Sequence, residues 1–159
     1  MQYTCVNGFE SSQQKMQCGI PQGSILGPLL FVIYINDLSS CLSKCKTSLY
    51  ADDTCLYYAS ENPKSVTETL NADLLIIDAW LKRNKLALNV KKCEFLMIGT
   101  TRRLKSAEVP DVLIQNVPIS RVTHCKYLGV LIDEHLDLVK HIEYLGKKIN
   151  KDIYLLKRI

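Results

Sequence analysis

The chain has 159 residues, of which 47% are hydrophobic and 23% are charged, and its formal net charge is +4. These values are typical of a soluble globular domain, or part of one, that is large enough for a hydrophobic core. The longest apolar run, residues 29–35, is far shorter than the roughly 20 residues of a membrane-spanning helix, and the polar residues 1–18 do not resemble a secretory leader. We therefore expect a protein with no signal peptide and no membrane segment.

The charge is unevenly distributed along the sequence. Residues 1–80 contain four Lys or Arg against eight Asp or Glu, a net charge of −4, whereas residues 81–159 contain sixteen against eight, a net charge of +8. The basic half could face a polyanion while the acidic half holds cations. A merely soluble surface is the alternative, and charge alone does not decide between them.

The seven cysteines are odd in number, and several lie among apolar, strand-forming residues. Reduced thiols pack there as small hydrophobic groups, which predicts a reducing, intracellular location in the nucleus or cytoplasm. Cys41 and Cys45 are close in sequence, but no further Cys or His pair completes a zinc site.

Residues 1–18 are predicted to be a strand-like polar segment. The loop that follows, residues 18–28, contains three glycines and two prolines and leads into a helix that begins with Ser24 as its cap or with Pro28 in its first turn. This helix continues to residues 36–37 and is apolar on all sides, which is typical of a buried helix. A loop that only delivers a core helix needs no ligand, so the loop by itself does not establish a binding site.

Residues 49–58 are predicted to form a strand, a tight turn and a second strand, with the adjacent carboxylates Asp52 and Asp53 at the tip. A turn allows neighbouring side chains to point the same way, and carboxylate oxygens are hard ligands suited to Mg²⁺. A solvated acidic turn is the simpler interpretation of such a pair when it is considered alone.

A long amphipathic helix is expected to start at Asn62 and Pro63 and to end near the basic residues 82–85. The pattern then predicts a strand over 94–98, a polar loop over 100–110, and a hairpin over 112–119 with Pro118 at an edge. Residues 124–133 are predicted to be one strand in which Gly129 marks a bulge or a close approach.

A basic amphipathic helix is expected from about residue 136 to the end of the chain. Its apolar stripe is Val139, Ile142, Leu145, Ile149, Ile153 and Leu156, and the lysines largely off that stripe are Lys140, Lys147, Lys148 and Lys151.

Four motifs in order closely resemble the reverse transcriptase domain of non-LTR (LINE-type) retrotransposons. The resemblance spans nearly the whole chain, although Cys93 stands where threonine is usual. The motifs are Gly19-Ile20-Pro21-Gln22-Gly23-Ser24 with residues 26–31 and 34–38; Tyr50-Ala51-Asp52-Asp53; Trp80, Asn84, Leu88-Asn89 and Lys92; and Lys126-Tyr127-Leu128-Gly129-Val130.

The resemblance implies an α+β fold, in which a polymerase palm-type antiparallel sheet is packed by helices and the beginning of a helical thumb follows. Residues 1–132 would be part of the palm, and residues 133–159 would start the thumb or its connecting helix. It also implies an RNA-directed DNA polymerase, a nucleotidyltransferase that joins deoxynucleoside triphosphates to a DNA primer on an RNA template.

In such a reaction two Mg²⁺ ions, with Mn²⁺ as a possible substitute, stabilise the entering and leaving oxygens. The resemblance makes Asp52 the main metal ligand and Asp53 a supporting carboxylate. Lys92 would protonate or neutralise the departing pyrophosphate, although an ordinary surface lysine is the alternative.

The resemblance also assigns binding roles. The template and nucleotide would lie against Pro21, Gln22, Gly23, Tyr50 and Ala51, and the primer would be gripped by Tyr127, Leu128 and Gly129. A Tyr-Leu-Gly-Val strand also packs well without nucleic acid, and the C-terminal basic helix either contacts duplex phosphates or is a plain packing helix.

In this family another aspartate, upstream of the glycine loop, completes the metal site. Glu10 and Asp37 do not fit that role, and the fingers are also missing. We therefore expect part of a reverse transcriptase, dependent on the remainder of the polypeptide and with little or no activity alone. Two alternatives remain: an inactive nucleic-acid-binding or interaction module, and a group II intron-type enzyme, which shares the Tyr-Ala-Asp-Asp hairpin.

Overall fold

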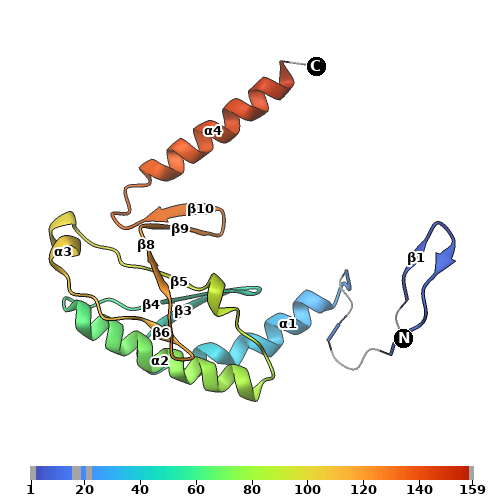
Figure 1. Cartoon of the computed structure of the whole chain (residues 1–159), viewed down its shortest axis with the longest axis horizontal. Helices are drawn as coiled ribbons and strands as arrows, with labels where there is room; N and C mark the ends of the chain where they lie inside the picture. The colour runs from blue at the N-terminus through green and yellow to red at the C-terminus, as the bar shows by residue number, and fades with distance from the viewer. Residues whose placement is uncertain (1–2, 16–18, 21–22, 158–159) are drawn as a thin grey trace. The chain divides into compact units, whose positions relative to one another are not determined.

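The computed structural model describes residues 3–15, 19–20 and 23–157. These residues fold into helices and short strands that belong to two units (Figure 1). One unit comprises Met1–Asp37 with Leu49–Thr54, and the other comprises Leu38–Ser48 with Cys55–Ile159. Among the described residues, no helix combines the length and the apolar character that a membrane crossing requires.

The first unit starts with a small hairpin. Strands β1 (Cys5–Val6) and β2 (Phe9–Glu10) pair antiparallel around Asn7 and Gly8, which both have positive φ angles, of 52° and 81°. Asn and Gly are the residues that most readily adopt this conformation in a two-residue turn. Within the strand-like segment predicted over residues 1–18, these two short strands are present, and residues 1–2 and 16–18 lie outside the described residues.

Helix α1 (Gly27–Ile35) has Pro28 in its first turn as predicted, but Leu26 rather than Ser24 is the N-cap residue. The helix ends at Ile35, and the 3₁₀ helix η1 (Asn36–Cys41) follows it. The expectation of a buried helix is wrong, since Ile35 is the one residue that α1 buries and Ile33 is 63% exposed. A pattern that is apolar on all sides requires cover on all sides, but it does not specify which segment provides that cover.

The acidic segment forms the predicted hairpin of β3 (Lys46–Tyr50) and β4 (Asp53–Tyr57). The strands are joined by Ala51 and Asp52 alone, and Ala51 has a φ of 51°. Short hairpin connections require positive φ angles because the turn must match the right-handed twist of its strands.

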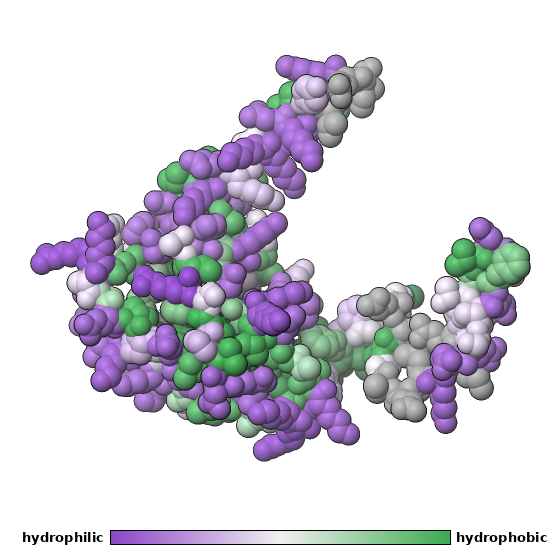
Figure 2. Space-filling view, in the orientation of Figure 1, coloured by the Kyte–Doolittle hydropathy of each residue, from purple (hydrophilic) through white to green (hydrophobic). Residues whose placement is uncertain are grey.

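Helix α2 (Pro63–Arg83) is the longest helix and starts where the sequence predicts. The Asn62 side chain accepts a hydrogen bond from the backbone N of Lys64 at 3.0 Å and so caps the helix. One face buries Ile77, Trp80 and Leu81, and hydrophobic residues gather among α2 and the strands of this unit (Figure 2).

The next segment contains elements that sequence patterns predicted only in part. The 3₁₀ helix η2 (Val90–Lys92) precedes β5 (Glu94–Leu96), and β5 pairs in parallel with β8 (Ser120–Val122), a strand that was not predicted. Helix α3 (Thr101–Ser106) lies in the expected loop and is capped by Thr100. The predicted hairpin is present as β6 (Leu113–Ile114) and β7 (Val117–Pro118).

The single strand expected over 124–133 is wrong, because this segment is a hairpin. Strands β9 (His124–Tyr127) and β10 (Val130–Asp133) pair antiparallel across Leu128 and Gly129, whose φ angles are 46° and 87°. Gly129 therefore belongs to a two-residue turn rather than a bulge. Leucine rarely adopts a positive φ, so its presence obscured the turn.

Helix α4 (Val139–Leu156) begins three residues later than predicted and packs against β10. The delay has a backbone cause, since Leu136 and Leu138 have φ angles of 57° and 58° that are incompatible with a helix. The described strands form five two-stranded sheets, four of them antiparallel or hairpin-like and one parallel. Mixed helices and small sheets of this kind agree with the α+β class.

Candidate active site

The tip of the β3–β4 hairpin exposes two adjacent carboxylates. Asp52 is the second residue of the turn and Asp53 is the first residue of β4, and both are exposed. Tyr50, which ends β3, is 64% exposed. The left-handed conformation of Ala51 costs about 1 kcal/mol for a residue with a Cβ atom, and strain of this kind is concentrated at functional sites.

The two carboxylates are the right type of ligand for a hard metal ion, but they are too few to complete its coordination. Their oxygens are the ligands that Mg²⁺ prefers. Within the described part of the chain, however, no group of three or more His, Cys, Asp or Glu residues could hold a metal ion. Asp52 and Asp53 therefore supply part of a ligand set, and further oxygen ligands would have to complete it.

The start of β3 is held by a buried carboxylate that sequence reasoning missed. Asp73 of α2 has no exposed surface, and its Oδ1 accepts hydrogen bonds from Ser43 N at 3.1 Å and Ser43 Oγ at 2.6 Å. Its Oδ2 accepts from Lys44 N at 3.1 Å and Cys45 N at 2.7 Å. An Asp at position 73, within the apolar face of α2 between Leu70 and Ile77, was the signal that could have revealed it.

The electrostatics of Asp73 follow from this geometry. Burial by itself would raise its pKa, but the hydrogen bonds from Ser43, Cys45 and Lys44 outweigh burial and hold the pKa well below its ordinary value. Asp73 is therefore charged at all physiological pH values and fixes the loop that enters β3.

Burial keeps four cysteines, Cys45, Cys55, Cys93 and Cys125, in the thiol form. Burial, together with the hydrogen bond and the charge of Asp73, raises the pKa of Cys45 to about 12. Burial also raises the pKa values of Cys55, Cys93 and Cys125. Thiols in this state are poor nucleophiles and poor metal ligands.

The residues predicted to grip the primer lie at the end of the β9–β10 hairpin. Tyr127 ends β9, and its hydroxyl donates a hydrogen bond to Ser48 Oγ of β3 at 2.8 Å. Leu128 and Gly129 form the turn, and Leu128 is 48% exposed. Within the second unit, β9 is thus tied to the base of β3, a link through Ser48 that no sequence motif indicated.

The other predicted site residues are less constrained. Pro21 and Gln22 lie outside the described residues. Gly23 has a φ of 87° and open space around its Cβ position, so a backbone requirement accounts for the glycine. Lys92 ends η2 in the second unit and is exposed.

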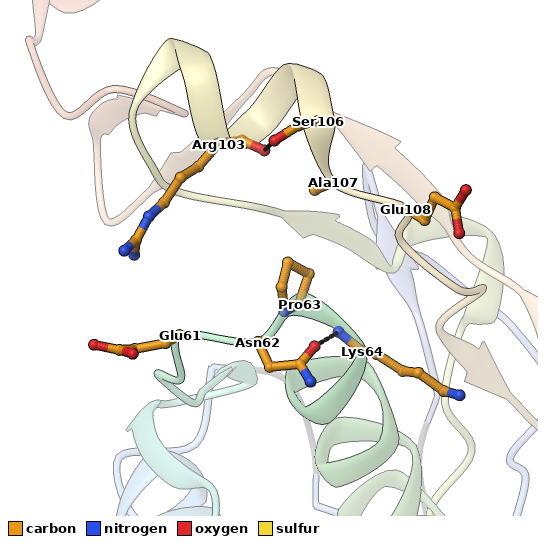
Figure 3. A pocket seen from close by; sticks show the side chains of 8 residues that line it. All are labelled: Glu61, Asn62, Pro63, Lys64, Arg103, Ser106, Ala107 and Glu108. Carbon is orange, nitrogen blue, oxygen red and sulfur yellow. Dashed lines mark hydrogen bonds between the residues drawn. The ribbon is translucent and has the colours of Figure 1, made fainter.

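A pocket of about 570 Å³ lies between the start of α2 and the end of α3 (Figure 3). Lys64 and Arg103 line it together with Glu61 and Glu108. The opposite charges offset one another, so the pocket has no strong preference for an anion or a cation. None of the predicted site residues lines it.

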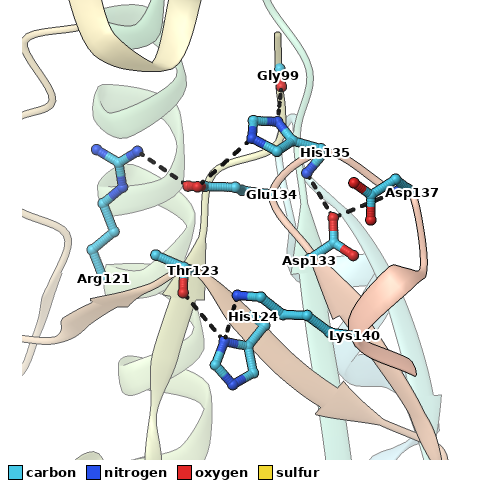
Figure 4. A network of polar contacts seen from close by, with 9 residues as sticks. All are labelled: Gly99, Arg121, Thr123, His124, Asp133, Glu134, His135, Asp137 and Lys140. Carbon is cyan, nitrogen blue, oxygen red and sulfur yellow. Dashed lines mark hydrogen bonds and ion pairs between the residues drawn. The ribbon is translucent and has the colours of Figure 1, made fainter. Parts of the chain in front are cut away.

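A polar network connects β10 to the start of α4 (Figure 4). Asp133 is 4% exposed, and its Oδ1 accepts from His135 N at 2.9 Å while its Oδ2 is buried without a partner in the described structure. Burial by itself would raise the pKa of Asp133. The backbone hydrogen bonds from His135, Asp137 and Leu138 outweigh burial, so the pKa lies below its ordinary value. Sequence reasoning also missed this anchor.

Basic and aromatic side chains meet where β9 approaches α4. Lys126 Nζ lies 3.4 Å from Tyr144 Oη and 5.3 Å from the centroid of the Tyr144 ring, which is a cation–π geometry. Lys140 Nζ lies 3.3 Å from His124 Nδ1. This face therefore brings two lysines close to aromatic side chains, a combination found on surfaces that contact nucleic acid.

Comparison with known proteins assigns the family. The family described as "Reverse transcriptase (RNA-dependent DNA polymerase)" matches residues 2–132. The chain is 31% identical over 134 residues to the "Probable RNA-directed DNA polymerase from transposon X-element" of Drosophila melanogaster, covering 82% of this chain and 14% of that protein. No solved structure matches the chain.

A second relative is the "RNA-directed DNA polymerase from mobile element jockey" of Drosophila melanogaster, which is 26% identical over 141 residues and covers 84% of this chain. The alignment includes 15% of that protein, so the chain spans about a seventh of the length of these curated relatives. Both names refer to mobile elements, in agreement with the resemblance to non-LTR retrotransposons. The chain belongs to the reverse transcriptase family.

Proposed function

We propose that this chain is part of an RNA-directed DNA polymerase of a retrotransposon and contributes the carboxylate hairpin of its active site. The observation that carries this proposal is the exposed pair Asp52 and Asp53 at the tip of a two-residue turn, in a chain of the reverse transcriptase family. Residues 1–132 would form part of a palm-type domain, and residues 133–159 would begin the thumb.

The proposed chemistry is nucleotidyl transfer to the 3′ end of a DNA primer on an RNA template. Divalent ions, Mg²⁺ or Mn²⁺, supply charge stabilisation for the entering and leaving oxygens. Asp52 would be the main metal ligand and Asp53 a supporting carboxylate beside it. Lys92 would offset the negative charge of the departing pyrophosphate.

The remaining residues position the substrates. The strained turn at Ala51, beside Tyr50, presents a small side chain to the nucleotide. We assign Pro21, Gln22 and Gly23 to contact with the template–nucleotide pair. Tyr127, Leu128 and Gly129 hold the primer terminus.

The metal site needs a further carboxylate. Two neighbouring aspartates cannot by themselves provide the geometry of a two-metal site. We therefore assign the missing ligand to polypeptide outside the described residues, and the relatives are long enough to supply it. On this basis the 159-residue chain alone has little or no polymerase activity.

Primer extension tests the proposal. The chain would be assayed alone and joined at its N-terminus to the preceding segment of the X-element relative, with an RNA template, a DNA primer and Mg²⁺ or Mn²⁺. The longer chain is expected to extend the primer, and Asp52→Asn is expected to lower its rate by about 100-fold or more because a metal ligand is lost. The matched control is Asp111→Asn, which changes an exposed aspartate that is not part of the hairpin. Equal rates for Asp52→Asn and the control would refute the assignment.

A second candidate function is an inactive nucleic-acid-binding module. The basic and aromatic face of β9 and α4 favours it, because that face needs no metal. This alternative predicts duplex binding that is sensitive to salt but unaffected by Asp52→Asn or by metal removal, with no primer extension from either form of the chain.

A further inference from the structure

The first turn of helix α4 is attached to the β9–β10 hairpin through a histidine. Leu131 N of β10 donates a hydrogen bond to His141 Nδ1 at 3.3 Å, and this bond is partly buried. Within residues 139–142, His141 is half-buried and the other three residues are exposed. His141 is therefore the residue of this turn that the hairpin holds by a backbone hydrogen bond.

This bond satisfies a donor at the edge of a sheet. Strands β9 and β10 are joined by a two-residue turn and form a sheet of two strands. In such a hairpin the pair next to the turn exchanges hydrogen bonds, and in the following pair, Lys126 and Leu131, the backbone groups point outward. The N–H of Leu131 therefore faces away from β9, and His141 accepts it where a third strand would otherwise do so.

The chemistry of the donor fixes the protonation state of His141. A backbone N–H can only donate, so Nδ1 of His141 directs its lone pair at Leu131 and the ring proton is on Nε2. A second proton would occupy Nδ1 and set two N–H groups against one another. The hydrogen bond therefore requires the neutral ring.

Protonation would also add positive charge at an unfavourable end of the helix. Helix α4 begins at Val139, so Lys140 and His141 lie in its first turn, which contains no acidic residue. Unpaired N–H groups make the N-terminal end of a helix positive. A charged His141 would therefore destabilise the first turn as well as its bond to Leu131.

The cations near this contact oppose a further positive charge. Tyr144 stacks on His141 with 6.4 Å between the ring centroids, and Lys126 of β9 lies over the Tyr144 ring. Lys140 Nζ can only donate and lies 3.3 Å from Nδ1 of His124, so that ring too is unprotonated at Nδ1 (Figure 4). Acidification would set a charged His124 against Lys140 and would weaken the same junction.

The carboxylates of the adjoining segments bind backbone groups. Oδ1 of Asp133 in β10 accepts from His135 N at 2.9 Å, and Oδ1 of Asp137 accepts from Val139 N at 3.0 Å. Among the residues that the structure describes, no carboxylate forms an ion pair with His141 that would favour its charged form. The other titratable groups of β9, the linker before α4 and the first two turns of α4 are Cys125, Tyr127, Glu134, His135 and Glu143.

We propose that the attachment of α4 to β10 is sensitive to pH: the neutral ring of His141 holds it, and protonation of that ring releases it. In acid, Leu131 N loses its acceptor and the first turn of α4 separates from the hairpin. This switch is independent of the polymerase function, because no residue of the predicted metal site takes part in it.

Amide hydrogen exchange, followed by NMR in the 159-residue chain, tests the release. The reference is the amide of Ile132, which faces β9 rather than α4 because outward and inward N–H groups alternate along the strand. Histidine changes its charge between about pH 7.5 and about pH 5.5. Over that interval the protection of Leu131, corrected for intrinsic exchange and divided by that of Ile132, should fall at least about fivefold, the effect of losing one hydrogen bond.

Two replacements of His141 separate its proton from its role as acceptor. In His141→Asn the side-chain oxygen lies as far from the backbone as Nδ1 and accepts a hydrogen bond, but it takes up no proton. The relative protection of Leu131 should then be the same at both pH values. His141→Ala removes the acceptor, so the relative protection should be low at both.

His135→Asn is the matched control. Nδ1 of His135 lies 3.1 Å from the carbonyl oxygen of Gly99, which can only accept, so this nitrogen carries a proton and its bond persists in acid (Figure 4). The variant should therefore show the same fall in Leu131 protection as the unchanged chain.

Four results would overturn the proposal. Leu131 could keep its relative protection at the lower pH, His141→Ala could retain the protection, or His141→Asn could show the same fall as the unchanged chain. In the last case, a fall that His124→Asn abolishes would place the switch at His124 and Lys140. Loss of protection at Ile132 together with Leu131 would show that acid unfolds the hairpin and does not release α4.

Discussion

At the scale of single residues, the start of β3 depends on side chains that belong to no motif. Asp73 receives four hydrogen bonds from residues 43–45, which lead directly into β3. The Tyr127 hydroxyl of β9 donates a hydrogen bond to Ser48, which belongs to β3. These contacts fix the first residues of β3 within the second unit, and they come from side chains at least 28 residues away in the sequence.

Asp73→Asn tests the role of the buried carboxylate in stability. The variant keeps the volume but loses two acceptor sites, and we expect it to lower the free energy of unfolding by roughly 1–3 kcal/mol at neutral pH. Because the folded-state pKa lies below the ordinary value of 3.8, the contribution of Asp73 is complete above about pH 4 and declines as the pH falls further. Urea unfolding should therefore show a smaller difference in unfolding free energy between the unchanged chain and Asp73→Asn at pH 3 than at pH 7. An equal difference at both pH values would contradict this account, and the exposed Asp111→Asn is the control.

The Tyr127–Ser48 hydrogen bond can be measured with a double-mutant cycle. Tyr127→Phe and Ser48→Ala should each cost about 0.5–1 kcal/mol of unfolding free energy, and the double variant should cost less than their sum. Strict additivity would show that the two hydroxyls do not interact. Tyr57→Phe, in the neighbouring strand β4, provides a matched control for the loss of an exposed tyrosine hydroxyl.

At the scale of elements, the ends of the strands and helices are set by unusual backbone conformations. Ala51, Leu128, Leu136 and Leu138 all have positive φ angles, although glycine is the usual residue in that region. Each of them terminates or connects an element: the β3–β4 turn, the β9–β10 turn, and the linker before α4. These connections are therefore imposed by tertiary structure against local preference.

Replacement of Leu136 by glycine should relieve this strain. Leu136 is 55% exposed, so little packing is lost, and we expect Leu136→Gly to stabilise the chain by about 0.5 kcal/mol. The matched control is Leu75→Gly in α2, which is 64% exposed and should destabilise by about 1 kcal/mol because glycine is unfavourable within a helix. Thermal unfolding measures the stability of both variants relative to the unchanged chain. Destabilisation by both substitutions would indicate that Leu136 is not strained.

Local signals predicted some elements better than others. The Asn62 cap, Pro63 and the apolar spacing of α2 all lie within the segment that they describe, so its start was predicted correctly. Strand β8 was missed because it is stabilised by pairing with β5, more than twenty residues away. The β9–β10 turn was missed because leucine occupies a position where sequence rules expect glycine or asparagine.

At the scale of the whole molecule, the two halves of the sequence differ in net charge. The half that contains the acidic hairpin has a net charge of −4, and the half that contains α4 has a net charge of +8. Positive charge concentrated in one half of a sequence favours contact with a polyanion such as nucleic acid.

Salt dependence tests the basic surface. We expect the affinity of the chain for an RNA–DNA duplex to fall steeply with salt concentration, because bound counterions are released. Replacing Lys140, Lys147 and Lys151 with Gln should reduce the slope by about 0.7–0.9 per lost phosphate contact. The control replaces Lys44, Lys46 and Lys64, which changes the net charge equally. Fluorescence anisotropy at several salt concentrations measures the duplex affinity of both triple variants. Identical salt slopes for the two variants would exclude α4 as the binding surface.

The sequence by itself determined the family, the carboxylate hairpin and the capped, amphipathic α2, because each depends on residues that are neighbours in the chain. Only the tertiary structure showed that Asp73 anchors the start of β3, that Tyr127 bonds Ser48, and that α1 and the apolar residues of α4 are exposed. These features depend on which distant segments meet, and hydrophobic patterns specify that a face needs a partner without specifying the partner. The same patterns cannot identify a buried carboxylate as an anchor, because its stability comes from backbone donors thirty residues away.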